Sequence, residues 1–254
     1  MLKGRVAAIT GAGNGIGRAT AIEFARRGAS VAVCDIDMPA SQETVTLIEI
    51  EGGTALFVHM DVGSSDSVSD GFREIADHFG RLDIVHANAA IELQKFIVDI
   101  EEHEWNRVMD VNLTGVFRCA REALKLFIPQ QSGNILITAS PHALATYEEI
   151  SAYAASKGGV VAFLRALSLE SAKHGIRVNC LLPGTIDTPM IQREIQSSSD
   201  PEKLKKMIAD MHPIGRIGRP EEVAKCAAFL VSDDASFVTG TCLAVDGGIM
   251  AKLG

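Results

Sequence analysis

The sequence lacks the features that mark several large classes of protein, beginning with paired cysteines. Its five cysteines are scattered and form no CxxC pair. They are Cys34, Cys119, Cys180, Cys226 and Cys242. An odd number of separated thiols among apolar neighbours argues against a disulfide framework or a redox pair, and no His/Cys/Asp cluster has metal-ligand spacing. We therefore expect core thiols in a reduced, cytoplasmic protein without a catalytic metal.

Excess positive charge and long apolar runs are also missing. The chain has 24 Lys and Arg against 32 Asp and Glu, a net charge of -8, which argues against binding to a phosphate backbone. No apolar run approaches the ~18 residues that span a bilayer. The opening "MLKGRVAAIT" leads into a glycine loop rather than a cleavage site. Neither nucleic acid nor a membrane is an expected partner.

Seven short apolar runs indicate strands that are buried on both faces. They lie at 6–10, 30–34, 54–60, 82–87, 134–139, 176–182 and 241–245. Segments with helical spacing, such as "GRATAIEFARRG" and "PEEVAKCAAFLVS", lie between them. This alternation predicts an α/β fold, a doubly wound parallel sheet of about seven strands with helices on both faces, in one domain over 1–254.

One polar segment, 188–213, breaks the alternation and contains no expected strand. Its Arg193, Lys203, Lys205 and Lys206 can be explained as a solvated face. The functional interpretation is a lid over the substrate.

A glycine loop, "TGAGNGIG", follows the first expected strand and opens a helix. Its usable spacing is Gly11, Gly15 and Gly17, which differs from the G-x-G-x-x-G fingerprint. Glycines let the backbone approach a pyrophosphate, and the helix N-terminus offers free N–H donors. The position of the loop between strand and helix favours a dinucleotide site.

Asp35 ends the second expected strand, where a carboxylate can accept hydrogen bonds from an adenosine ribose and repel a 2′-phosphate. Asn14 in the loop brings no positive charge, so the sequence predicts NAD rather than NADP. The alternative is that Asp35 merely forms a turn. Other polar and small residues follow the third and fourth strands at the same sheet edge. They are Asp61, Val62, Asn88, Ala89 and Ala90.

Tyr153 and Lys157 are four residues apart in "SAYAASKGGVVAFLRALSLE", so on a helix they share one face. They could be a core tyrosine and a snorkelling lysine. In a catalytic interpretation the ammonium favours the phenolate, and Ser140, at the end of the fifth strand, holds the substrate oxygen while Tyr153 moves a proton.

Taken together, these motifs resemble those of the short-chain dehydrogenase/reductase family over essentially the whole length. "VNLTG" is similar to its helix-embedded asparagine segment and "LLPGTIDTP" to its PG motif. The resemblance implies that Asn112, Ser140, Tyr153 and Lys157 are catalytic. It implies cofactor binding by Gly11, Asn14, Gly15, Ile16, Gly17, Asp35, Asp61, Val62, Asn88, Ala89, Ala90, Tyr153, Lys157, Pro183, Gly184, Ile186 and Thr188.

The resemblance also implies a mechanism in which Lys157 lowers the pKa of Tyr153 and Asn112, where a helix is interrupted, supports a water chain. It further implies a homotetramer, paired through "TGVFRCAREALKLF" and "AASKGGVVAFLRALSLE". Ala90 stands where the family has glycine, and Ala87 where it has an asparagine, so we expect a modest adjustment of cofactor fit.

The expected activity is hydride transfer between NAD and a small secondary alcohol or ketone. His142 could hydrogen-bond the substrate, together with Ser140 and Tyr153, or be only an exposed loop residue. If His142 acts, a polar alcohol, polyol or sugar is favoured. The alternatives are an NADPH-dependent ketone or 3-oxoacyl reductase, disfavoured by Asp35, and a non-catalytic NAD-binding sensor or scaffold, which would have no need of the four catalytic residues.

Overall fold

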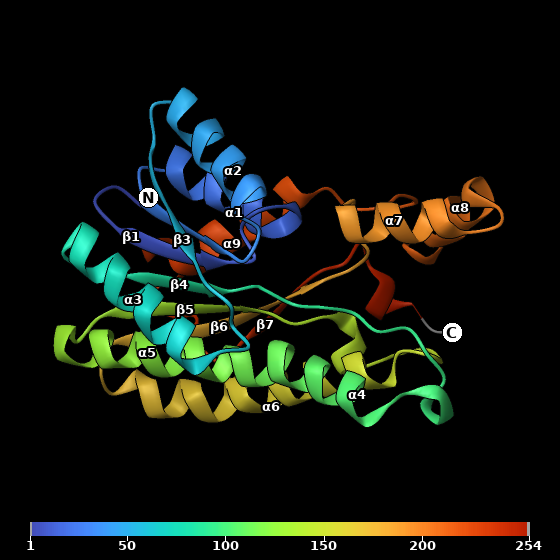
Figure 1. Ribbon diagram of the computed structural model, residues 1–254. Helices are drawn as coiled ribbons and strands as arrows, with labels where there is room; N and C mark the ends of the chain where they lie inside the picture. Colours follow the sequence, from blue (N-terminus) through green and yellow to red (C-terminus); the bar gives the residue numbers. More distant parts are fainter. Residues whose placement is uncertain (1, 253–254) are drawn as a thin grey trace.

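The computed structural model describes residues 2–252 and contains a continuous parallel sheet (Figure 1). The strands are β1 (Val6–Thr10), β2 (Ser30–Asp35), β3 (Thr54–His59), β4 (Ile84–Ala87), β5 (Gly133–Thr138), β6 (Ile176–Pro183) and β7 (Cys242–Val245). Their order is β3-β2-β1-β4-β5-β6-β7, and every neighbouring pair is parallel. The chain therefore winds outward in both directions from the junction of β1 and β4.

Helices cover both faces of this sheet (Figure 1). On one face lie α1 (Gly15–Arg26), α2 (Met38–Ile50) and α9 (Pro220–Val231). On the other lie α3 (Ser65–Phe79), α4 (Glu102–Met109), α5 (Gly115–Gln130) and α6 (Ser151–Ala172). The predicted doubly wound Rossmann-type fold is confirmed, and every predicted strand end lies within two residues of the observed one.

Successive side chains of the central strands pack into two different hydrophobic cores, one on each face of the sheet. Ala7 and Ile9 of β1 pack with α1 and α9, whereas Ala8 packs on the opposite side, toward α3 and α5. Side chains alternate between the faces of a strand, so a sheet covered on both sides needs unbroken apolar runs. The apolar runs in the sequence follow directly from this requirement.

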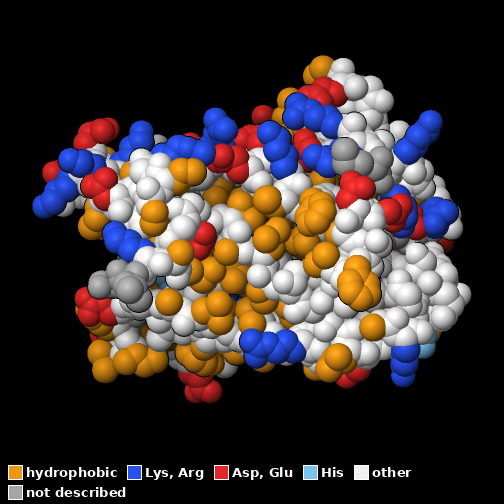
Figure 2. Space-filling view, turned by 180° about the vertical axis from the view of Figure 1, so that it is seen from behind, with side chains coloured by type: hydrophobic (Ala, Val, Ile, Leu, Met, Phe, Trp, Pro, Cys, Tyr) orange, Lys and Arg blue, Asp and Glu red, His pale blue; other side chains and the backbone are white. Residues whose placement is uncertain are grey.

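The segment predicted as a lid forms two helices beyond the carboxyl ends of the strands, α7 (Pro189–Ser197) and α8 (Pro201–Met211), drawn in orange in Figure 1. Asp200 separates them and caps α8 by accepting from the Lys203 N–H at 3.1 Å. The basic side chains of this segment lie on its outer surface, which carries many lysines and arginines in Figure 2. Across residues 2–252, no helix combines the length and apolarity required to cross a bilayer.

Candidate active site

The glycine loop after β1 lines a cleft of about 290 Å³ at the carboxyl edge of the sheet. Gly11 and Gly15 have φ values of 66° and 53°, a conformation that side chains rarely adopt. Asn14 precedes α1 but makes no side-chain cap, so the first N–H groups of that helix stay available for an anion. This backbone fits the pyrophosphate of a dinucleotide.

Most of the predicted cofactor residues meet at this cleft. Its lining includes Gly11, Asn14, Gly15, Ile16, Asp35, Asp61, Val62, Asn88, Ala89, Ala90, Tyr153, Lys157 and Thr188. Gly17 does not line it: a Cβ there would overlap the Gly11 carbonyl, so Gly17 allows α1 to pack against its own loop. Residues that sequence reasoning missed here include Ile36, Arg107 and Thr138, which belong to no motif.

Asp35 is held in place at one wall of the cleft by two backbone donors. Its Oδ2 accepts from the Gly13 N–H at 2.9 Å and its Oδ1 from the Asp37 N–H at 3.0 Å. The contact with Gly13 ties the end of β2 to the glycine loop. Asp35 therefore both forms a turn and lines the cofactor cleft.

Asn88 links β1, β4 and β5 at the point where the strand order of the sheet reverses. Its amide donates to the Thr10 carbonyl at 3.0 Å, and its Oδ1 accepts from the Thr138 hydroxyl at 3.1 Å. The backbone N–H groups of Asn88 and Ala89 donate to the Thr10 hydroxyl. The buried His86 ring lies 2.8 Å from the Thr138 hydroxyl, and burial lowers its pKa to about 3. These hydrogen bonds fix the positions of the residues at the base of the cleft.

Ser140, Tyr153 and Lys157 converge where the cleft meets a second cavity. Ser140 follows β5, and Tyr153 and Lys157 lie one turn apart on α6. The Lys157 Nζ is 5.5 Å from the centre of the Tyr153 ring and donates to the Thr138 carbonyl at 2.8 Å. The Ser140 hydroxyl accepts from the His142 N–H and makes a hydrogen bond with Tyr153.

The electrostatics of this trio differ from the sequence-based expectation. Burial and the Glu92 carboxylate raise the pKa of Tyr153, and the hydrogen bond with Ser140 opposes them only in part. Burial lowers the pKa of Lys157 from 10.5 to about 8. The Lys157 ammonium bonds to the Thr138 carbonyl rather than to the phenol hydroxyl, and it lies 5.5 Å from the centre of the phenol ring.

Replacing Lys157 with methionine should make the protein more stable at pH 7. The depressed pKa of this buried amine corresponds to about 3 kcal/mol of destabilisation below pH 8, which disappears as pH rises toward 10.5. Methionine removes this cost and forfeits one hydrogen bond of about 1 kcal/mol. Melting followed by circular dichroism should show a Tm higher by about 4–8 °C at pH 7 and a flatter pH dependence between pH 8 and 10. A lower Tm at pH 7 would contradict this account.

Asn112 lies in a π-helical segment, Asp110–Thr114, between α4 and α5. Its amide Nδ2 donates to the Ile91 carbonyl at 2.8 Å and to the Ser156 hydroxyl at 3.1 Å, and its Oδ1 accepts from the Ile91 N–H at 2.9 Å. The side chain thus joins the loop after β4 to α6. The expected interruption of a helix is present. In the wider π-helical turn, backbone carbonyls are displaced from the hydrogen-bond pattern of an α-helix.

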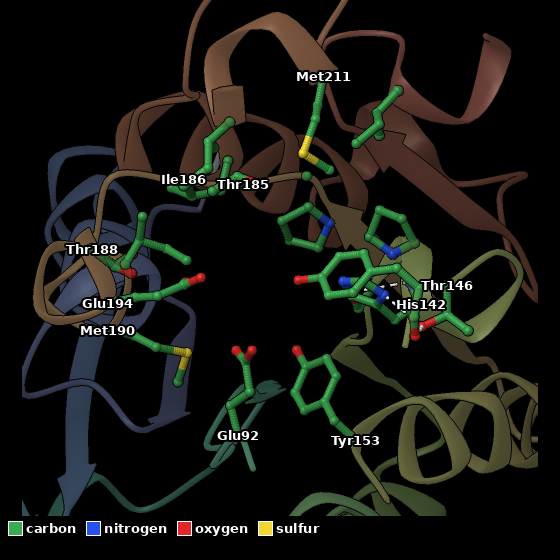
Figure 3. Close-up of a pocket in the computed structure, with 18 of the residues that line it drawn as sticks. Glu92, His142, Thr146, Tyr153, Thr185, Ile186, Thr188, Met190, Glu194 and Met211 are labelled. Atoms are coloured by element: carbon green, nitrogen blue, oxygen red, sulfur yellow. Dashed lines mark hydrogen bonds between the residues drawn. The ribbon is translucent and has the colours of Figure 1, made fainter. Parts of the chain in front are cut away.

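The second cavity, of about 520 Å³, opens beside Tyr153 and is covered by α7 and α8 (Figure 3). Pro183, Gly184, Ile186 and Thr188 line this cavity, and only Thr188 also reaches the cofactor cleft. A Cβ on Gly184 would lie 2.9 Å from His212 Nε2. The His212 ring accepts from the Thr185 N–H at 3.0 Å, and its other nitrogen lies 2.8 Å from the Ile208 carbonyl. These contacts connect the end of the lid to the loop that follows β6.

His142 and the loop after β5 form one wall of this cavity. The His142 ring lies 3.0 Å from the Thr146 hydroxyl and packs edge-on against Tyr147, with ring centres 4.9 Å apart. Burial lowers its pKa, which favours the neutral ring. Both tyrosines of the chain, Tyr147 and Tyr153, line the cavity.

Glu92 and Glu194 also reach this cavity, and sequence reasoning missed both. Figure 3 shows their carboxylates directed into the open space near the Tyr153 hydroxyl. Glu194 belongs to α7, where helical spacing could have placed it on the face of Met190 and Ile191. Glu92 follows β4 in a segment without helix or strand, so no periodic signal indicates where it points.

Comparison with known proteins agrees with this geometry. The family model described as "Enoyl-(Acyl carrier protein) reductase" matches residues 11–250. The chain belongs to the short-chain dehydrogenase/reductase family. It is an oxidoreductase for CH–OH substrates in a family that uses NAD or NADP.

Individual relatives span nearly the whole chain. Cis-4-hydroxycyclohexanecarboxylate dehydrogenase of Sinomonas cyclohexanicum is 40% identical, covering 97% of each chain. The 3-oxoacyl-[acyl-carrier-protein] reductase FabG of Thermotoga maritima is 35% identical, covering 98% of this chain and 99% of its own. The crystal structure of levodione reductase superposes with a TM-score of 0.97 at 33% identity over 100% of both chains.

Proposed function

We propose that this protein transfers hydride between NAD and a small secondary alcohol or ketone, with Tyr153 as acid and base. The observation that carries the proposal is the convergence of Ser140, Tyr153 and Lys157 at the junction of two cavities. Tyr153 lines both, so its hydroxyl can meet a substrate on one side while the cofactor lies on the other. A sensor or scaffold would not require this arrangement.

Each of the four proposed catalytic residues has a separate role in the reaction. Ser140 holds the reacting oxygen, and Tyr153 removes the hydroxyl proton in oxidation or returns it in reduction. Lys157 supplies positive charge beneath the phenol ring, and a water chain supported by Asn112 carries the proton onward. When bound, an oxidised nicotinamide supplies the hydride acceptor and the additional positive charge that a phenolate needs.

Four features support NAD over NADP. The carboxylate of Asp35 lines the cleft, and the next residue is the exposed Ile36 rather than a cation. Arg18 is already engaged, because its guanidinium donates to the Gly13 carbonyl and pairs with Glu43 at 2.7 Å. Among the described residues that line the cleft, Arg107 is the one cation besides Lys157, and it lies beside Gly63 in the loop after β3.

The lining of the second cavity favours a compact hydrocarbon substrate over the polyol or sugar expected from His142. The lid contributes apolar side chains at helical spacing. They are Met190, Ile191, Leu204, Met207, Ile208 and Met211. A polyol would need a hydrogen-bond partner in every direction, and these side chains offer none. A secondary alcohol on a hydrocarbon ring fits this surface.

The proposal is tested by following NADH formation with cyclohexanol, a polyol and an open-chain secondary alcohol. Cyclohexanol should be oxidised with NAD at a kcat/KM at least about tenfold above that for the polyol. The runner-up activity, favoured by the relation to FabG, is an NADPH-dependent 3-oxoacyl reductase. Turnover of a 3-oxoacyl thioester with NADPH and of no alcohol with NAD would replace the proposal by that alternative.

A homotetramer paired through α5 and α6 is part of the same proposal. Phe117 of α5 and Leu169 of α6 are 43% and 79% exposed, and the Phe117 ring lies 6.5 Å from Phe163. Apolar side chains exposed on two packed helices are typical of a subunit interface. Light scattering should give the mass of four chains, and a monomeric mass would contradict this pairing.

A further inference from the structure

The two carboxylates in the substrate cavity have no counter-charge. Glu92 and Glu194 are half-buried, and among the described residues neither side chain has a hydrogen-bond or ion-pair partner. Burial raises the pKa of both, and Glu194 adds to the effect on Glu92. Burial raises the pKa of Tyr147 to about 12, and the Glu92 and Glu194 carboxylates add to this effect. All three side chains line the same cavity.

No cation of the described lid or walls offsets this charge. The lining of the cavity contains neither lysine nor arginine among the described residues, and burial lowers the pKa of its one histidine, His142. Lys203 and Lys206 of α8 line a neighbouring depression that shares Met207 and Met211 with the cavity. In Figure 3 the Glu92 and Glu194 carboxylates point into the open space of the cavity, and Ile186 and Met211 lie across that space from Glu92.

We infer that Glu92 and Glu194 form a cation-accepting wall, and that the substrate is a compact hydrocarbon alcohol or ketone that also carries a protonated amine. This inference rests on the proposed function, because Ser140 and Tyr153 fix the end at which the reacting oxygen binds. An ammonium between the carboxylates would be paired with them and satisfy acceptors that now lack donors. An anion in the same place would be repelled by both.

The apolar lid decides between an amine and a sugar. Hydroxyl groups on the face of a substrate toward Met190, Met207 and Met211 would be buried without partners, whereas ring carbons would pack there. The cavity therefore combines two carboxylates with the apolar side chains of the lid, which matches a hydrocarbon molecule that carries one amine.

The test uses three ligands with the same ring: cyclohexanol, cis-4-aminocyclohexanol and cis-4-hydroxycyclohexanecarboxylate. Each is titrated by calorimetry into the protein saturated with NADH, in which an alcohol cannot be oxidised. The amine should bind at least about tenfold more tightly than the acid. In Glu92→Gln/Glu194→Gln this preference should fall below about twofold, and each single variant should lose part of it.

Glu202→Gln is the matched control, because it removes an exposed carboxylate of α8 that does not line the cavity. Its preference for the amine should equal that of the unchanged protein. Equal or tighter binding of the acid, absence of amine binding at millimolar concentration, or a preference that survives in the folded double variant would each overturn the inference. Oxidation of cyclohexanol with NAD separates the two proposals, since turnover without charge preference supports the function and rejects only the cation-accepting wall.

Discussion

Replacing Tyr153 with phenylalanine is expected to lower kcat by about 10³-fold or more and to leave the Kd for NADH within about twofold. The substitution removes the phenol hydroxyl, which Ser140 contacts where the two cavities meet. The ring itself remains packed, 6.0 Å from His142 and 5.5 Å from the Lys157 ammonium. Loss of proton transfer without loss of shape is therefore the expected result, measured by steady-state kinetics and NADH fluorescence titration.

Tyr147→Phe is the control for this prediction, because it makes the same change to the other tyrosine of the cavity. Its kcat should fall by less than about tenfold, since Tyr147 packs on His142 and is not expected to exchange the proton. If Tyr153→Phe retained more than a tenth of the activity, Tyr153 would not be the acid and base.

A second large effect is expected for cofactor choice, with kcat/KM at least about 100-fold higher for NAD than for NADP. A carboxylate at the end of β2 gains charge-assisted hydrogen bonds from ribose hydroxyls, each contributing about 1.5–3 kcal/mol, and repels a phosphate. Asp35→Asn preserves the shape and an oxygen that can accept from the Gly13 N–H at this position. The ratio should drop at least about tenfold, with most of the loss in the KM for NAD.

Asp37→Asn is the companion measurement. Asp37 is exposed two residues further on, where it caps α2 by accepting from the Ala40 N–H at 3.1 Å. This variant should lose some stability and keep the cofactor ratio, because its carboxylate does not line the cleft. Equal kcat/KM values for NAD and NADP in the unchanged protein would contradict the role proposed for Asp35 in cofactor choice. An unaltered ratio of these values in Asp35→Asn would contradict it as well.

Much of the site could be placed from sequence because of how a parallel sheet is built. Residues that follow β1, β2, β3, β4 and β5 all emerge at one edge, so the glycine loop, Asp35, Asp61, Asn88 and Ser140 are brought together by topology alone. Tyr153 and Lys157 share a helical face whatever that helix contacts. These placements depend on local periodicity and strand order, which the sequence carries directly.

Other features could not be read in this way because they depend on contacts between distant segments. Gly17 looks like a cofactor residue in the motif, yet its neighbour is the Gly11 carbonyl. The expected acidification of Tyr153 depends on where the Lys157 ammonium lies. The ammonium lies 5.5 Å from the centre of the phenol ring and donates to the Thr138 carbonyl, and Glu92 also faces the hydroxyl. A pKa depends on all surrounding charges and on burial, and neither follows from spacing.

The amino-acid sequence by itself determined the doubly wound sheet, the edge at which the cofactor cleft opens and the tyrosine–lysine pair, since each follows from repeating local patterns. Only the tertiary structure decided what the substrate cavity presents. The helices of the lid place methionines along the cavity and keep their lysines out of its lining, and an irregular segment after β4 brings Glu92 into the same cavity as Glu194. The charge of a cavity is set by side chains that converge from separate elements, and such convergence exists only in the folded chain.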